Sequence, residues 1–473
     1  MNGYSNSLLI LLAFLPSIAF AALEAPHEIA PAITAQDKSD NSGGAMDSDA
    51  GVGYEEAPPA TIESAPMEKP STDGFGTLTE SSGGLPGTIW QSDNRAADEF
   101  LLQQLHTGIS DPALHDLLVK LLMTQSTPPT GTSSNDWLTL RVNALAGIGE
   151  DDKANTMINA LPPSLAADQL LELQISIALA HGDYDRACKQ TPPSGSTSAF
   201  WKKISILCQT RAGKFDEAMV GVDMLRESSP DDPFFQDLIR HLADRNVPLK
   251  TLPRDISLLD YSLIVMAGES NRLSDRLDSM PPIAVKYLAQ DTRVDAKLRE
   301  KATTKAQQLG LLPPTPSSTL PSQPFAKELA SDVTTLVTAL GSGQPPTDAD
   351  NAVIARLAVE NAGVRDSRRI SRLLSCMELF GYKVPDKTWN VLLNRKGRFD
   401  GEIPPAMLVD RLGQAAQAGR KGETILTAAL IAGNSSADNI SDLALIPIVK
   451  ALKSIGFEKE ARQLAYEAVK NYQ

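Results

Sequence analysis

Aromatic residues are scarce in this chain of 473 residues, where Phe, Trp and Tyr together make up 5%. This content suits the Leu/Ala-rich packing of helices better than a β-sandwich, since aromatic residues are typical of strands. The sequence also lacks stretches of alternating apolar and polar residues and the turn signals of hairpins. These absences predict an all-α protein.

Basic charge is also in short supply, with 44 Lys and Arg against 58 Asp and Glu and a net charge of −14. Residues 22–86 contain twelve of the acidic residues and only two basic ones. The remainder has 46 acidic and 42 basic residues, so it is nearly neutral and has no basic patch. Because phosphate backbones are bound by clustered Lys and Arg, we expect no nucleic-acid partner.

Motifs of catalysis and metal binding are missing. The chain contains no HExxH and no CxxC, and its five histidines are scattered. Residues 341–343 and 418–424 resemble catalytic or phosphate loops only superficially, because neither follows a strand and the second lacks the Gly-Lys-Ser/Thr ending. Both are interpreted as turns that end helices. We therefore predict a protein that is not an enzyme, with no catalytic residue, no cofactor and no metal site.

Cysteine occurs only three times. Cys188 and Cys208 lie on helices expected to be neighbours, so a disulfide between them is expected in an oxidising compartment. It would close a 20-residue loop and stabilise the folded protein by about 3 kcal/mol. The alternative is a pair of buried thiols. Cys376 stands among apolar residues and is expected to be a buried core thiol.

Only one long hydrophobic run is present, from Leu8 to Phe20. It has the length of a signal-peptide core, and Ala19-Phe20-Ala21 at its end fits the small-x-small cleavage rule, so cleavage is expected after Ala21. The segment departs from the usual signal-peptide pattern in one respect, because its amino-terminal region contains no Lys or Arg. No other stretch is long enough to span a membrane. We expect signal peptide 1–21, no stable membrane span after cleavage, and a periplasmic or secreted protein.

The composition divides the rest of the chain. Residues 22–86 are rich in Pro, Ser, Gly and acidic residues and are predicted to be a disordered acidic linker. Leucines at three- and four-residue steps then mark amphipathic helices. A Pro-rich linker at 313–324 is expected to separate a helical-repeat domain at 87–312 from a C-terminal helical domain at 325–473.

One turn pattern recurs along the helical part. A glycine closes an apolar helix and an alanine follows five residues later on the next helix, where it permits close packing. The first three glycines are 33 and 31 residues apart, which is a period of helix–turn–helix repeats. The four glycine–alanine pairs are Gly149 and Ala154, Gly182 and Ala187, Gly213 and Ala218, and Gly456 and Ala461.

This pattern resembles degenerate tetratricopeptide-like repeats, most firmly over residues 134–228. Trp137, Leu170 and Trp201 stand twelve residues before the first three glycines, although the full W-x2-L-G-x2-Y signature is incomplete. The overall layout is also similar to poorly characterised exported helical proteins of alphaproteobacteria. The resemblance implies a right-handed solenoid of helical hairpins. Arg141 and Gln174, on the first helix of their hairpins, are expected to line its concave face.

The sequence leaves three functions open. The first is an exported, non-enzymatic scaffold that binds a protein or peptide partner in the cell envelope, as solenoids commonly do. The second is an accessory domain of an enzyme that acts on peptidoglycan or another glycan. The third is a purely structural module of the envelope.

Overall fold

A computed structural model describes residues 71–133, 135–192, 196, 198–228, 232–250, 252–313, 325–393 and 404–472. Within these ranges the prediction of an all-α protein is confirmed: there is no β-strand, and only two isolated β-bridges occur, Leu78–Thr124 and Asn94–Thr130. The predicted signal peptide 1–21 and residues 22–70 of the predicted linker lie outside the described residues, as do 314–324 of the Pro-rich linker.

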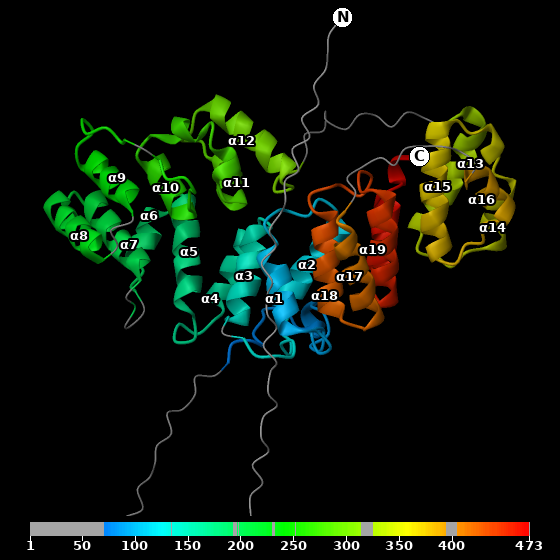
Figure 1. Cartoon of the computed structure of the whole chain (residues 1–473), viewed down its shortest axis with the longest axis horizontal. Coiled ribbons are helices and arrows are strands. Elements are labelled where there is room, and N and C mark those ends of the chain that lie inside the picture. Colours follow the sequence, from blue (N-terminus) through cyan, green and yellow to red (C-terminus); the bar gives the residue numbers. More distant parts are fainter. Residues whose placement is uncertain are drawn as a thin grey trace, which may run out of the picture. The chain divides into compact units, whose positions relative to one another are not determined.

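The described residues form twenty α-helices and five short 3-10 helices (Figure 1). The α-helices are α1 (Arg95–Gln103), α2 (Pro112–Met123), α3 (Trp137–Gly147), α4 (Asp151–Asn159), α5 (Asp168–Ala180), α6 (Tyr184–Lys189), α7 (Ala199–Arg211), α8 (Phe215–Ser228), α9 (Pro233–Ala243), α10 (Leu258–Met266), α11 (Pro282–Gln290), α12 (Ala296–Gln308), α13 (Lys327–Gly341), α14 (Asp348–Arg356), α15 (Val364–Leu379), α16 (Asp386–Leu393), α17 (Ala406–Gln417), α18 (Lys421–Ala432), α19 (Asp442–Ser454) and α20 (Glu458–Glu467). The 3-10 helices are η1 (Glu80–Ser82), η2 (Ser270–Leu273), η3 (Leu277–Ser279), η4 (Val359–Asn361) and η5 (Lys470–Tyr472).

Side-chain caps define several helix starts. Asp111 accepts a hydrogen bond of 2.8 Å from the backbone N–H of Leu114, and Pro112 occupies the first position of α2. Asp232, which precedes α9, likewise accepts a hydrogen bond of 3.0 Å from the backbone N–H of Phe235. A short polar acceptor followed by proline satisfies exposed N–H groups without losing a helical hydrogen bond, so both helices begin at Asp-Pro pairs.

The four glycine–alanine turns adopt one geometry. They join α3 to α4, α5 to α6, α7 to α8, and α19 to α20. The glycines have φ of 88°, 79°, 75° and 97° in chain order, a region that disfavours side chains with a Cβ. The four alanines are all buried, with at most 1% of their surface exposed. Glycine therefore ends each first helix, and alanine lets the second helix pack closely against it.

A fifth turn of this kind lies at residues 418–424. Gly419 has φ of 68° between α17 and α18, and Thr424, five residues later, is fully buried. The Thr424 hydroxyl donates to the carbonyl of Arg420 at 2.6 Å, which satisfies it inside the protein. Threonine replaces alanine here, which is why the sequence pattern did not include this hairpin.

The segment 71–86 belongs to the folded body, so the predicted linker boundary at residue 86 is wrong. The N–H groups of Thr77 and Leu78 donate to the carbonyl of Met123 at 3.0 and 3.1 Å, and Leu78 in turn accepts from Gln125. Leu85 is buried in the core. The Pro, Ser and Gly composition of this segment hid these contacts, since backbone hydrogen bonds leave no trace in a hydrophobicity pattern.

Helices α10 and α11 lie against the first helices of the earlier hairpins. α10 packs on α5, and α11 contacts α3. At the end of α12 the carbonyl of Leu309 accepts a 2.8 Å hydrogen bond from the N–H of Gly108. A Cβ on Gly108 would stand 2.3 Å from the carbonyl oxygen of Gly310, so the two backbones touch.

The expected division into separate domains at 87–312 and 325–473 is not observed. The described residues from 71 to 472 belong to one compact unit, in which α1 and α2 contact α18, and α2 also contacts α20. α13 packs on α20, and α15 packs on α19. The N–H of Glu423 donates to the Asp93 carboxylate at 2.9 Å, across 330 residues of chain. The residues that make these contacts are far apart in the sequence, and no sequence pattern predicts that they meet.

Candidate functional site

The structure joins Cys188 on α6 and Cys208 on α7 in a disulfide, with a Cα–Cα distance of 5.7 Å. Cys376 on α15 is a free, fully buried thiol. Burial raises the pKa of Cys376 to about 12, so this thiol stays protonated at neutral pH and is a poor nucleophile.

Three of the four described histidines are engaged by neighbouring groups, and the fourth, His106, is exposed. His115 Nε2 lies 3.1 Å from Glu150, His181 Nε2 lies 3.4 Å from Asp151, and His241 Nδ1 lies 2.7 Å from the carbonyl of Val247. Among the described residues, no three His, Cys, Asp or Glu side chains are arranged to hold a metal ion.

Asp151 connects the turn after α3 to helix α11. Its carboxylate accepts hydrogen bonds from Lys286 Nζ at 2.5 Å and from the Tyr287 hydroxyl at 2.7 Å, and the His181 ring stacks edge-on against Tyr287. Burial raises the pKa of Asp151, but the hydrogen bonds from His181, Lys286 and Tyr287 outweigh burial and hold it below its ordinary value. The ion pair between Asp151 and Lys286 joins two packed elements, and its carboxylate has hydrogen-bond donors, so we assign it a structural role.

The two residues expected to line a concave face are buried instead. Arg141 has no exposed surface, and its guanidinium donates to the carbonyls of Phe75, Leu122 and Thr124 at 2.6–2.9 Å. Gln174 is 8% exposed and donates to Asn159 at 2.8 Å. Both expectations are wrong, because the chain itself covers these positions.

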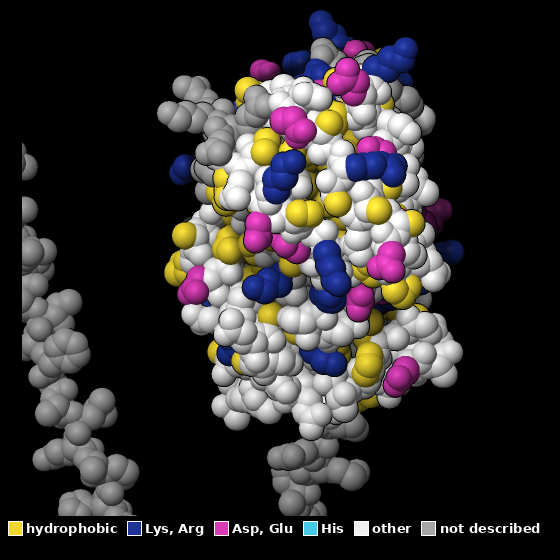
Figure 2. Space-filling model, turned by 90° about the vertical axis from the view of Figure 1, so that its right-hand side faces the viewer, with side chains coloured by type: hydrophobic (Ala, Val, Ile, Leu, Met, Phe, Trp, Pro, Cys, Tyr) yellow, Lys and Arg dark blue, Asp and Glu magenta, His cyan; other side chains and the backbone are white. Residues whose placement is uncertain are grey.

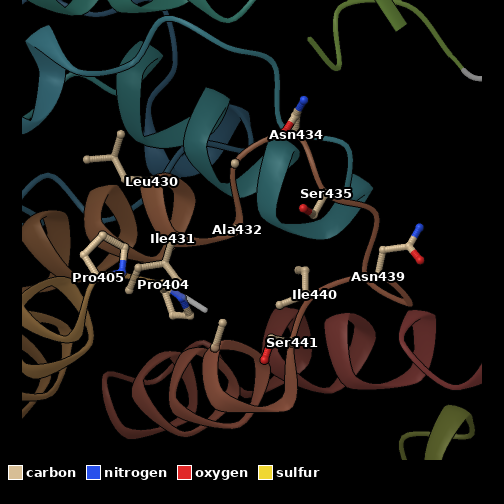
Figure 3. Close-up of a pocket in the computed structure, with 12 residues that line it drawn as sticks. Pro404, Pro405, Leu430, Ile431, Ala432, Asn434, Ser435, Asn439, Ile440 and Ser441 are labelled. Atoms are coloured by element: carbon tan, nitrogen blue, oxygen red, sulfur yellow. The ribbon is translucent and has the colours of Figure 1, made fainter. Parts of the chain in front are cut away.

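A pocket of about 190 Å³ lies between the start of α17, the end of α18 and the start of α19; we call it the C-terminal pocket (Figure 3). Pro404 and Pro405 lie on one side of it and Asn434, Ser435 and Asn439 belong to the loop that follows α18. None of the lining residues is charged or a histidine, so they offer hydrogen bonds and no acid or base. The volume is below the roughly 300–1,000 Å³ typical of sites for drug-sized ligands.

A second pocket, of about 390 Å³, lies where α13 meets α20. Residues 341–343 line it, and they end α13, with Gly343 at φ of 71°. Two cationic residues line it, Lys459 and Arg462. Arg462 is stacked 4.3 Å from the centre of the Phe380 ring and lies 3.3 Å from Glu458, whereas Lys459 is exposed. Phe380 and Glu458 thus already engage the guanidinium of Arg462.

Three carboxylates are buried where α1 meets α18. Asp93, Asp98 and Glu423 are each at most 1% exposed, and we call them the carboxylate cluster. Glu423 lies 2.9 Å from Arg411 and 3.1 Å from Arg420. Neither oxygen of Asp98 has a hydrogen-bond partner. The sequence held one weak signal for this cluster: Asp98 shares a helix face with the apolar pair three and four residues later.

Burial dominates the electrostatics of this cluster. It raises the pKa of Asp93 to about 7 and that of Asp98 to about 9, and the negative charge of Glu423 adds to both shifts. Hydrogen bonds from the backbone N–H groups of Gly422 and Glu423 oppose the shift at Asp93. At neutral pH Asp98 is therefore protonated and Asp93 is close to half-protonated.

Helix α8 has an exposed apolar pair on its outward face. Val220 and Met224, one helical turn apart, are 62% and 66% exposed. The same face bears exposed acidic residues around the pair, namely Asp216, Glu217, Asp223 and Glu227. The opposite face of α8 is buried through Ala218, Val222 and Leu225. We call the outward face the α8 patch.

Elsewhere the surface is mixed. On the face shown in Figure 2, basic and acidic side chains are interspersed and apolar side chains are scattered in small groups. None of the described helices is long and apolar enough to cross a membrane. No protein-family model matches this chain, and no curated protein or solved structure matches it.

Proposed function

We propose that this protein is an exported, non-enzymatic helical-repeat scaffold that binds a protein or peptide partner in the cell envelope. The shared geometry of the turns after α3, α5 and α7 supports a degenerate tetratricopeptide-like arrangement of hairpins. Repeats of this kind commonly present surfaces to other proteins.

Two features support export. The apolar run before Ala21 has the pattern of a cleaved signal peptide. The disulfide between Cys188 and Cys208 is of the kind that persists in oxidising compartments and is rare in the cytosol. Together they favour a periplasmic or secreted location.

The α8 patch is the observation that carries the binding proposal. The first-helix positions Arg141 and Gln174 are covered by the chain, so they are not available to a partner. Val220 and Met224, in contrast, are more than half exposed on the second helix of the hairpin α7–α8. Methionine adapts its shape readily and is frequent at surfaces that bind peptides.

The charges around the patch define the partner. Four exposed acidic residues surround the apolar pair, while Lys214 and Arg226 pair with Glu217 and Asp223 and offset only part of that charge. A partner segment with an apolar anchor between Lys or Arg residues complements this pattern. We therefore propose a basic amphipathic segment of another envelope protein as the occupant.

Site-specific crosslinking tests the proposal. A photoreactive residue replaces Val220 in the full chain, and another replaces Val364 on α15, which is 50% exposed and serves as the matched control. We expect one protein to be crosslinked from position 220 and not from 364, through a peptide with Lys or Arg beside an apolar residue. The Met224→Asp variant should abolish the product while leaving the circular dichroism spectrum unchanged, and added salt should weaken it.

Other outcomes contradict the proposal. Crosslinks only to cell-wall fragments would favour the glycan-associated alternative. Equal products at both positions, or none at either, would remove the α8 patch as a binding surface and favour a structural module.

A further inference from the structure

The joint between α1 and α18 is built around a remote helix cap. The first turn of α18 has no cap from its own preceding residue, Arg420. Instead Asp93, 330 residues earlier, accepts a 2.9 Å hydrogen bond from the N–H of Glu423. A carboxylate at a helix N-terminus also interacts favourably with the helix dipole. Asp93 thus ties the C-terminal helices to the segment before α1.

Close packing seals the same joint. Gly422 faces the indole of Trp90, and a Cβ at this glycine would stand 2.1 Å from the ring. Trp90 is completely buried and meets Trp137 edge-on at 5.1 Å. Bulk water is therefore kept away from the carboxylates that lie beside these rings.

The buried charges do not balance when every carboxyl group is ionised. The charged groups that act on Asp98 are Asp93 from the preceding turn, Glu423 from α18, Arg411 from α17 and Arg420 from the turn before α18. Three carboxylates face two guanidiniums, and both guanidiniums lie against Glu423. Asp98 has no hydrogen-bond donor for either oxygen. An ionised Asp98 would thus be a buried charge without a partner, which is strongly unfavourable.

We propose that the α1–α18 joint is a proton-operated latch, closed while the carboxylate cluster holds protons and loosened when it loses them. Opening would expose the cluster to water, release the first turn of α18 from Asp93 and separate Gly422 from Trp90. The hydrogen bond of 2.7 Å from Ser110 to the carbonyl of Asn434 spans the same junction and borders the C-terminal pocket. Loosening of the latch therefore reaches that pocket.

The direction of the pH effect follows from linkage. The pKa of Asp93 is raised to about 7 and that of Asp98 to about 9 in the closed state, whereas both return toward 3.8 when exposed to water. The closed state therefore binds more protons between pH 4 and pH 9. The latch is tightest below about pH 4 to 5 and weakens as the pH rises through 7 and then 9.

Hydrogen exchange of the full chain tests the latch, with the Glu423 amide as the direct reporter. After correction for the intrinsic exchange rate, we expect protection in the first turn of α18 to fall about tenfold per pH unit between pH 7 and 9, where Asp98 alone contributes. Between pH 4 and 7, where Asp93 also contributes, the fall should be steeper. Protection in α7 serves as the internal reference and should change much less. In the Asp98→Asn variant, a neutral isostere, the decrease above pH 7 should disappear.

Asp93→Asn provides a second variant, because its amide oxygen can still accept from Glu423. It should remove the Asp93 share of the decrease, which extends from about pH 4 to about pH 7, and the double variant should be flat from pH 5 to 9. The matched control is Asp223→Asn on the surface of α8, which should behave like the wild type. Equal pH dependence in the wild type and the double variant, or no pH dependence in the wild type, would overturn the proposal.

Discussion

At the scale of single residues, Arg141 shows how a polar side chain can organise apolar surroundings. Its buried guanidinium binds three backbone carbonyls, from Phe75, Leu122 and Thr124. Burial lowers the pKa of Arg141 to about 10, so it keeps its charge at neutral pH. The carbonyls belong to the segment 71–86 and to the end of α2, and Arg141 holds the two together.

Replacing Arg141 should therefore be costly. In Arg141→Met three buried carbonyls lose their donor, and we expect the free energy of unfolding to fall by about 3 kcal/mol or more. Urea denaturation followed by circular dichroism measures the change. Arg226→Met, which removes an exposed partner of Asp223, is the control and should change stability by about 0.5 kcal/mol or less. A similar small effect at Arg141 would contradict the assigned role.

Residue identity predicted some of these roles and not others. The turn glycines were recognisable because few residues besides glycine adopt positive φ, and the buried alanines because they follow at a fixed spacing. Arg141 was misjudged as a surface residue, since a charged side chain on a helix is usually solvated. Its partners are carbonyls, which every residue has and no sequence pattern distinguishes.

At the scale of helices, the disulfide stabilises one pair of neighbours. It connects α6, which has only six residues, to the first helix of the next hairpin. A helix this short has little stability of its own. The covalent link therefore holds α6 in place against α7.

Removing the disulfide should destabilise the protein measurably. Closing a 20-residue loop restricts the unfolded chain, so Cys188→Ala/Cys208→Ala should lower the free energy of unfolding by about 3 kcal/mol. Reductant should destabilise the wild type by a similar amount and leave the double variant unaffected. If reductant changes both proteins equally, the disulfide is not the source of the effect.

Two helical glycines make a matched pair, Gly422 at the α1–α18 joint and Gly413 away from it in α17. Gly422→Ala places a methyl group into Trp90 and should destabilise by about 1–3 kcal/mol. Gly413→Ala in α17 meets nothing within 4 Å and should stabilise by about 0.5–1 kcal/mol, because alanine favours the helix. Thermal unfolding of both variants measures the contrast. Two effects of the same sign would contradict the close packing of α18 on Trp90.

At the scale of the whole molecule, sequence periodicity predicted the helices but not how distant helices meet. Leucine spacing marks the buried face of a helix and does not identify what covers it. The Pro-rich linker therefore suggested two domains, whereas α1 and α2 contact α18. The carboxylate cluster arises from this contact, since Asp93 and Glu423 come together only in the folded chain.

The most direct test of a single body closed at the α1–α18 joint is to cut the chain between its two halves. A specific protease site replaces residues 316–322, and the folded protein is cleaved and passed over a gel-filtration column at pH 6. We predict that the two fragments co-elute as one particle, because the contacts across the joint bury the core residues Trp90 and Ile425. Fragments that separate at pH 6 without denaturant would show two independent domains and contradict the account.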